Sequence, residues 1–235
     1  MRVPLTRALA GALAVGGLVL AGLGSPAEAG TSAKATVRSA IAATETLSAL
    51  KIAGSISAQG QTVKLSVSAS SSGTGQGTIG IGKGVATVRS VGGVVYFNAN
   101  KAFWDAEGGK STASEFAGKW VSTAATSQSG TELSEFLNST SFMKQVFGNN
   151  LTNSTFSFAG NTTVAGKKVT VISGHDTKNK SGGKLYITKS GTPYILKIRI
   201  NGKTGTGQIT FSDFNKAVTP AAPAGAIDLD TLSGS

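Results

Sequence analysis

The chain has 235 residues, with 22 Lys and Arg against 11 Asp and Glu, a formal net charge of +11 and no cysteine. The absence of cysteine excludes disulfide bonds, thiolate catalysis, Cys-ligated metals and lipidation of an N-terminal cysteine. The basic excess predicts anionic neighbours, such as phospholipid head groups, polymers like teichoic acids, or nucleic acid.

A secretory signal peptide is predicted for residues 1–29. Arg2 and Arg7 begin it, an uncharged apolar run follows over residues 8–23, and Ala27-x-Ala29 is the small-residue pattern that signal peptidases cleave. The apolar run is shorter than the roughly 20 residues that cross a bilayer, so a membrane anchor is the less favoured alternative. We therefore expect a soluble, secreted mature chain.

Cleavage after residue 29 would remove two basic residues and one acidic residue, which leaves 20 basic and 10 acidic side chains. Residues 20–23 resemble a lipobox, but Leu23 stands where lipidated proteins have cysteine. We therefore expect a protein that is secreted or associated with the cell wall and is not lipid-anchored. Export also makes nucleic acid the least expected anionic partner, and none is predicted.

In chain order, the mature sequence begins with a predicted helix over residues 31–49, because Val37, Ile41 and Leu47 recur at near-helical spacing. After Leu50 the apolar residues alternate with polar ones, which is typical of strands with one buried face. Strands are predicted over residues 63–69, 79–81, 85–91 and 94–97.

Residues 101–151 return to helical spacing and hold most of the large apolar side chains. One amphipathic helix is predicted over residues 132–148, with Glu132 and Glu135 in its first turn, where the helix dipole favours acids. Further strands are predicted around residues 156–158, 169–171, 185–187, 194–200 and 209–211. The Pro- and Ala-rich tail, residues 219–235, is predicted to be extended and to pack along a sheet edge.

Catalytic patterns are scarce. His175 is the only histidine, and Asp176 beside it would point to the other side of a strand, so a solvated loop residue is favoured over a catalytic pair. One histidine without cysteine argues against a metal site. Residues 75–80 match the glycine pattern of dinucleotide sites, but a strand pattern continues where a helix would be needed. We expect no enzyme activity, no metal and no cofactor, and a hydrolase is a distant third possibility.

Three stretches together resemble a known family. They are Val91-Gly92-Gly93-Val94-Val95-Tyr96-Phe97 followed by Phe103-Trp104, then Gly118-Lys119-Trp120-Val121, and finally Ile209-Thr210-Phe211-Ser212-Asp213-Phe214 leading to Pro220, Pro223, Ile227 and Leu229. With the order of elements, they resemble the LppX/LprG-type lipoproteins (LppX_LprAFG) of the LolA-like superfamily, over most of residues 33–232. The missing lipidation cysteine is the main departure. The Gly- and Ala-rich composition is typical of an actinobacterial secreted protein.

The resemblance implies an α+β fold in residues 30–218: an antiparallel β half-barrel with an N-terminal helix and a helical insert that covers its concave face. Family members bind acyl chains of lipids or lipoglycans in an apolar cavity there. The corresponding lining here would be Val67, Ile81, Phe97, Phe116, Phe136, Leu137, Phe142, Phe147, Phe156, Phe158, Leu196 and Ile198. Without the resemblance, the same residues predict an ordinary filled core.

A basic run lies in the last third of the chain. Lys197 and Arg199 alternate with Leu196 and Ile198, so we expect a strand that is apolar on its inner face and basic on its outer face. Contact with an anionic membrane or a cell-wall polymer is predicted for Lys178, Lys180, Lys184, Lys197 and Arg199. A merely solvated face explains the same pattern equally well.

The sequence thus favours a monomeric, non-catalytic lipid- or lipoglycan-binding protein that holds acyl chains in an apolar cavity, where each buried methylene contributes about 0.8 kcal/mol. The alternative is a cell-envelope interaction or sensor protein of the same fold. Its core would be filled, and it would bind anionic wall polymer or a regulatory partner.

Overall fold

The structure, a computed structural model, describes residues 32–58, 60–147, 154–176, 181–202 and 205–232. The predicted signal peptide lies outside these residues. The strands are β1 (Ala49–Ala58), β2 (Gln61–Ser70), β3 (Gly75–Ile81), β4 (Gly84–Val91), β5 (Val94–Ala99), β6 (Trp120–Ala124), β7 (Thr155–Val164), β8 (Lys167–Asp176), β9 (Ser181–Thr188), β10 (Ile195–Gly202), β11 (Gly205–Ser212) and β12 (Ile227–Asp228). The helices are α2 (Ala33–Glu45), α3 (Lys101–Phe116), α4 (Gln128–Leu137), α5 (Ser139–Phe147) and α6 (Leu229–Leu232).

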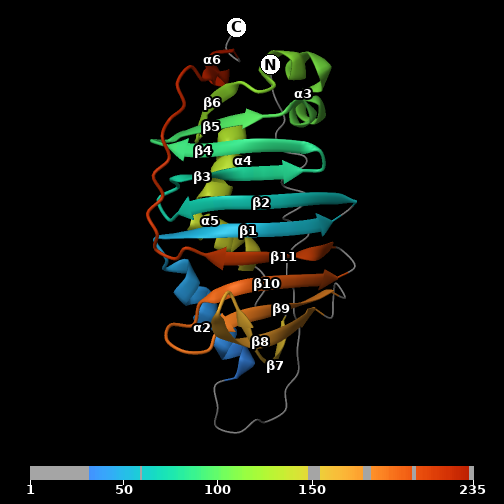
Figure 1. The fold of residues 1–235 in the computed structure, drawn as a ribbon, viewed down its shortest axis with the longest axis vertical. Coiled ribbons are helices and arrows are strands. Elements are labelled where there is room, and N and C mark those ends of the chain that lie inside the picture. Colours follow the sequence, from blue (N-terminus) through green and yellow to red (C-terminus); the bar gives the residue numbers. More distant parts are fainter. Residues whose placement is uncertain (1–31, 59, 148–153, 177–180, 203–204, 233–235) are drawn as a thin grey trace.

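The twelve strands form one open sheet in the order β12-β6-β5-β4-β3-β2-β1-β11-β10-β9-β8-β7 (Figure 1). Every neighbouring pair is antiparallel except β12 and β6, which are parallel. The β1–β11 pair joins the N-terminal meander to the C-terminal one. The predicted α+β half-barrel with an antiparallel sheet is therefore confirmed.

The helices α2, α4 and α5 pack on one face of this sheet, which we call the core face; the opposite face is the outer face. In Figure 1, α4 and α5 lie behind β1–β4, and α2 lies beside β9 and β10. Val37 and Ile41 of α2, with the apolar side chains of α4 and α5, join the core-face residues of the strands in a single buried cluster. The predicted N-terminal helix and helical insert are thus confirmed, although α2 ends at Glu45 and Ala49, the last residue of the predicted helix, begins β1.

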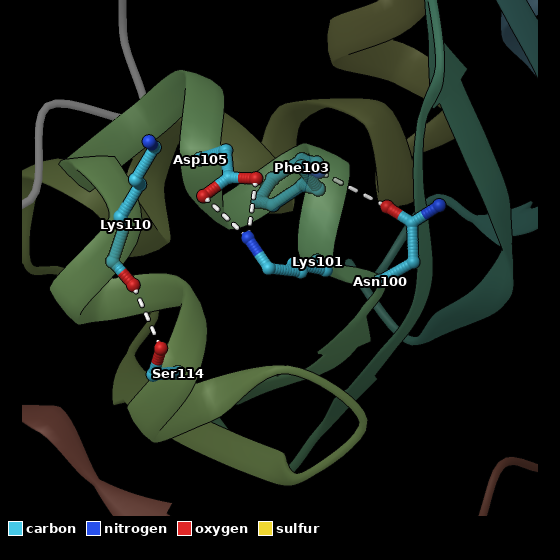
Figure 2. Close-up of polar contacts among 6 residues, drawn as sticks. All are labelled: Asn100, Lys101, Phe103, Asp105, Lys110 and Ser114. Carbon is cyan, nitrogen blue, oxygen red and sulfur yellow. Dashed lines mark hydrogen bonds and ion pairs between the residues drawn. The ribbon is translucent and has the colours of Figure 1, made fainter.

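Helix α3 packs against β4 and β5, and polar contacts at its start and along it are drawn in Figure 2. The Asn100 Oδ1 atom caps it by accepting a hydrogen bond from the Phe103 backbone N–H at 3.0 Å, and Lys101 pairs with Asp105 at 2.8 Å. Gly109, with φ of 81°, divides it into two helical pieces. The cap fixes the start of the helix, which directs Phe103 and Trp104 into the core.

The predicted single helix over residues 132–148 is wrong, because α4 and α5 are separate. Asn138 between them has extended backbone angles, forms a bridge with Ser70, and caps α5 through its Oδ1 atom, which accepts from the Ser141 N–H at 2.9 Å. Helix α4 also begins at Gln128, capped by Ser127, so Glu132 and Glu135 lie beyond its first turn. The acidic-first-turn explanation for these two residues is therefore wrong.

The C-terminal tail packs along the sheet edge as predicted, but Leu229–Leu232 form the short helix α6 where an extended segment was predicted. In Figure 1 it runs from the end of β11 along the sheet to α6 beside β6. There Ile227 and Asp228 pair with Val121 and Ser122 of the edge strand β6. The predicted packing of the tail along a sheet edge is confirmed.

Among the described residues, no helix is both long enough and apolar enough to cross a membrane.

Candidate functional site

Most of the predicted cavity residues meet on the core face. Those fully buried in the single apolar cluster are Val67, Phe97, Phe116, Phe136, Leu137, Phe142, Phe147 and Ile198, and those partly buried against it are Ile81 and Phe156. They come from five strands and three helices that lie far apart in the sequence. The fold therefore brings together most of the side chains that the resemblance singled out.

The insert approaches the sheet closely at β3. A Cβ atom on Gly75 would lie 2.8 Å from the Leu137 Cβ, so only glycine allows α4 to end at this distance from the strand. Phe142 of α5 then contacts Phe211 of β11, with 6.4 Å between ring centroids. Because Ile209 and Phe211 alternate with polar residues, sequence spacing could have added Phe211 to the predicted site.

Aromatic rings fill the β6 end of the same face. Trp104 is fully buried, and its ring centroid lies 5.4 Å from that of Phe97 and 5.3 Å from that of Phe116. Trp104 was named for the family resemblance but not for the site, although it is one of the largest buried side chains there.

The apolar core face reaches solvent at the opposite end, along the edge strand β7. One row of register partners runs from Ile198 through Leu185 and Ile172 to Phe158. The first three side chains are at most 2 % exposed, whereas Phe158 is 55 % exposed. The row therefore carries an apolar surface from the buried cluster to the molecular edge.

Leu196 does not share the core face with Ile198, so this part of the prediction is wrong. The β10–β9 pairing shifts between Ile195 and Lys197, which pair with the consecutive residues Ile187 and Tyr186. This β-bulge inserts one extra residue, so Ile195 and Ile198 face the core while Leu196 turns to the outer face. Leu196 is buried there, outside the core cluster, and it lines a separate pocket.

Three of the five predicted basic residues lie in the described part of the chain. Lys178 and Lys180 lie outside the described residues. Lys184 and Arg199 are exposed register partners on the outer face, and the Lys197 Nζ atom lies 5.4 Å from the centroid of the Tyr186 ring. Lys197 and Arg199 thus lie opposite Ile198 as predicted, but not opposite Leu196, which shares their face.

Lys184 and Arg199 belong to a longer row of register partners. Across the outer face it comprises Ser157, Ser173, Lys184, Arg199, Gln208, Ser55 and Lys64. The row contains three cations and four side chains that can donate hydrogen bonds, and no carboxylate. Because strands lie about 4.8 Å apart, it extends over roughly 29 Å.

Two carboxyl groups between α3 and α4 have raised pKa values. For Glu107 the pKa is raised by burial and then by the nearby Glu132 charge. For Glu132 the pKa is raised by burial and then by Glu135. Both shifts come from removal of a carboxylate from water beside like charges, and they disfavour the charged form.

The structure does not bring the candidate catalytic residues together into a site. His175 is exposed while Asp176 is fully buried, as expected for neighbours on opposite sides of a strand. His175 lies on β8, so its predicted loop position is wrong. Residues 75–80 lie within β3, and in the described part of the chain no three His, Cys, Asp or Glu residues are grouped to hold a metal ion.

Solved structures share this architecture. Lipoprotein LppX from Mycobacterium tuberculosis is 15 % identical, with 79 % of this chain and 96 % of that chain aligned at a TM-score of 0.51. LprF from Mycobacterium bovis is 16 % identical, with 86 % of this chain and all of that chain aligned at a TM-score of 0.55. No protein-family model and no curated protein matches the sequence.

Proposed function

Starting from a fold that LppX and LprF share, we propose that this chain is a secreted, non-catalytic protein that binds a lipid or lipoglycan and holds its acyl chains against the core face. The observation that carries the proposal is the apolar row ending at Phe158. An acyl chain needs an apolar path inward, and Phe158 marks the point where this row of apolar side chains reaches solvent.

The free energy gained by burying an acyl chain supports lipid binding. Burial of apolar surface contributes roughly 25 cal/mol per Å², so a long acyl chain lying along the row would bind with few polar contacts. Helix α2 contacts β7, β9 and β10, three of the four strands that carry the row. We place the ligand entrance between α2 and β7, with Phe158 at the rim and Phe156 behind it.

Native mass spectrometry of residues 30–235, purified from the secreting host, tests the proposal directly. A stoichiometric mass shift that organic extraction removes, with a lipid in the extract, is the expected result. A protein of unshifted mass, both as purified and after incubation with host lipid extract, would contradict it.

A change at the rim locates the entrance. Phe158→Asp puts a charge on the core face at the edge, and Ser157→Asp puts the same charge one residue away on the outer face. We expect Phe158→Asp to slow lipid uptake and Ser157→Asp to leave it unchanged, with both unfolding free energies close to wild type because both side chains are exposed. Equal uptake by the two variants would exclude this entrance.

A blocking change separates a cavity from a filled core. Ile198→Trp adds volume on the core face, and Thr87→Trp adds the same side chain at an exposed outer-face position. If acyl chains occupy the core face, Ile198→Trp abolishes lipid binding at that face with little loss of stability. In a filled core it lowers the free energy of unfolding by roughly 1–3 kcal/mol relative to Thr87→Trp.

The outer-face row favours a second function, binding of an anionic wall polymer. Seven of the ten acidic residues that follow residue 29 lie on α3, α4, β12 and α6, at the other end of the sheet from Lys184 and Arg199. Two like charges side by side on adjacent strands repel each other, so an anion between them would be bound favourably. A linear polyanion can lie along the row across several strands.

Charge reversal tests this second function. The double variant Lys184→Glu and Arg199→Glu should lose binding to purified teichoic acid, measured by co-sedimentation at low salt. The control, Lys83→Glu with Lys110→Glu, changes the net charge equally at exposed positions outside the row. Equal loss in both double variants would mean that net charge alone, and not the row, holds the polymer.

A further inference from the structure

An apolar pocket lies on the outer face of the sheet, where the turn between β7 and β8 approaches β10 and β11. It has a volume of 570 Å³ and is lined by Val164, Ala165, Lys167, Leu196, Thr210, Phe211, Ser212, Asp213 and Phe214. Thr210 pairs with Lys197, which puts it on the outer face, and the β-bulge turns Leu196 to the same side. The pocket is within the range of small-molecule sites, roughly 300–1,000 Å³.

The pocket depends on coiling of the sheet at the β7–β8 hairpin. The hairpin turn lines the same pocket as β10 and β11, although β9 separates β8 from β10 in the sheet. The Lys167 Nζ atom lies 5.9 Å from the centroid of the Phe214 ring, which follows β11. Val169 and Val171 are buried without belonging to the core cluster, so β8 covers an apolar area of its own.

Backbone conformation sets this pocket apart from the rest of the described chain. The non-glycine residues with positive φ among the described residues are Ala165 at 47°, Asp213 at 51° and Asn215 at 59°. Ala165 and Asp213 line the pocket, and Asn215 follows its wall residue Phe214. Such conformations cost about 1–3 kcal/mol each and persist where surrounding contacts impose them.

Hydrogen bonds of Asn215 and a ring contact of Phe214 hold this segment of the pocket wall in place. The Asn215 Oδ1 atom accepts hydrogen bonds from the Ser48 N–H at 2.9 Å and the Ser48 hydroxyl at 3.1 Å, and the Asn215 N–H donates to Ala49 O at 2.8 Å. The Phe214 ring packs against the Tyr194 ring at a tilt of 57°, with 5.1 Å between centroids. The wall is therefore fixed before any ligand arrives, which favours binding.

We propose that this outer pocket binds a single-chain anionic amphiphile, with its acyl chain along Leu196 and Phe214 and its anionic head group at Lys167. The ion pairs of the described residues join Lys101 to Asp105 and Lys216 to Asp213, so the Lys167 ammonium group has no carboxylate partner there. Lys168 beside it is also exposed and basic. Long-chain carboxylates and lysophospholipids share this chemistry. The site is distinct from the core-face site and does not depend on it.

Fluorescence titration with cis-parinaric acid tests the outer pocket. Ser212→Trp fills the pocket from an exposed position, and Leu196→Trp fills it from its floor. We expect both variants to lose one bound equivalent of the probe, which Ile198→Trp on the core face retains. If Ser212→Trp and Leu196→Trp bind the probe like wild type while circular dichroism shows them folded, the proposal fails.

The head group is tested with an uncharged analogue. Lys167→Gln should weaken binding of cis-parinaric acid by up to about fivefold, the strength of an exposed ion pair, and should leave binding of its methyl ester unchanged. Competition by palmitate and by lysophosphatidylglycerol then distinguishes the two natural sources. An equal loss for acid and ester would overturn the assignment of Lys167.

A direct reporter locates the bound chain. Phe214→Trp introduces an indole into the pocket wall, whereas Trp104 reports from the core. Brominated palmitate should quench the fluorescence that this substitution adds to that of the wild type. If brominated palmitate quenches only the native tryptophan emission, which the wild type also has, the outer pocket is empty and the proposal is refuted.

Discussion

At the scale of single residues, the molecule keeps two carboxylates where burial and like charge act against ionisation. Glu107 and Glu132 come from different helices, and each has a raised pKa. A carboxyl group whose pKa is higher in the folded state than in the unfolded chain binds its proton more tightly when folded. Its charged form therefore lowers the free energy of unfolding, fully so above the raised pKa.

Replacement of Glu107 by Gln tests this effect. As the pH rises from about 4 through and above the ordinary pKa of 4.5, the wild type should lose stability relative to Glu107→Gln, because only the wild type releases that proton. Denaturant unfolding across this range measures the difference, which should disappear at the acid end. Glu115→Gln, an exposed site on the same helix, is the control. A difference that grew toward acid pH would contradict the sign.

Some residues of the site could be placed from the sequence, and others could not. Phe136, Leu137, Phe142 and Phe147 could be assigned to the core because large apolar side chains are concentrated in the helical insert, although they lie on two helices and not on one. Leu196 could not, because a β-bulge leaves no mark in an alternating sequence and moves one side chain across the sheet. The outer pocket was missed for the same reason.

At the scale of elements, strands with clear apolar alternation and closing turns were predictable, and others were not. Strand β1 was missed: Gly54 interrupts its apolar residues, at a position where a Cβ would lie 2.0 Å from Gln208 O. Strand β6 was missed because its five residues lie between helices. The break between α4 and α5 was missed because apolar spacing continues across Asn138, whose capping and bridging contacts depend on the folded sheet.

Asn138→Ala should therefore destabilise the helical insert. It removes the cap of α5 and the hydrogen bond from Asn138 Nδ2 to Ser71 O. Loss of a cap costs about 1 kcal/mol, which urea unfolding would detect. Asn161→Ala is the matched control, because that side chain is exposed and makes one long contact of 3.5 Å with Thr170. Equal stability of the two variants would mean that the cap is dispensable.

At the scale of the whole molecule, the C-terminal tail connects the middle of the sheet to its β6 edge. The Arg89 guanidinium donates a hydrogen bond to Ala221 O at 2.9 Å along the way. At the end, the Asp230 carboxylate accepts hydrogen bonds from the Thr123 hydroxyl at 2.8 Å and the Ala124 N–H at 2.7 Å. The tail therefore fastens β12 and α6 onto the last antiparallel strand.

Asp230→Ala should loosen this attachment. Two hydrogen bonds to a charged group are lost. Because the Asp230 side chain is exposed, each contributes about 1.5 kcal/mol, the low end of the range for such bonds, so we expect a loss of about 3 kcal/mol at most. Limited proteolysis should cut the tail sooner in the variant, while Lys216→Ala at the start of the tail should behave like wild type. Unchanged cleavage would show that the strand pairing of Ile227 and Asp228 suffices.

The sheet thus ends differently at its two sides. At one end, β12 and Asp230 form hydrogen bonds with backbone groups of β6. At the other end, no described strand pairs with the free edge of β7. A sheet that can lengthen at both ends grows into filaments, but one that can lengthen at a single end stops once two copies have met. Because the tail covers the β6 end, we expect any sheet-extending association of this protein to stop at a closed pair joined through β7.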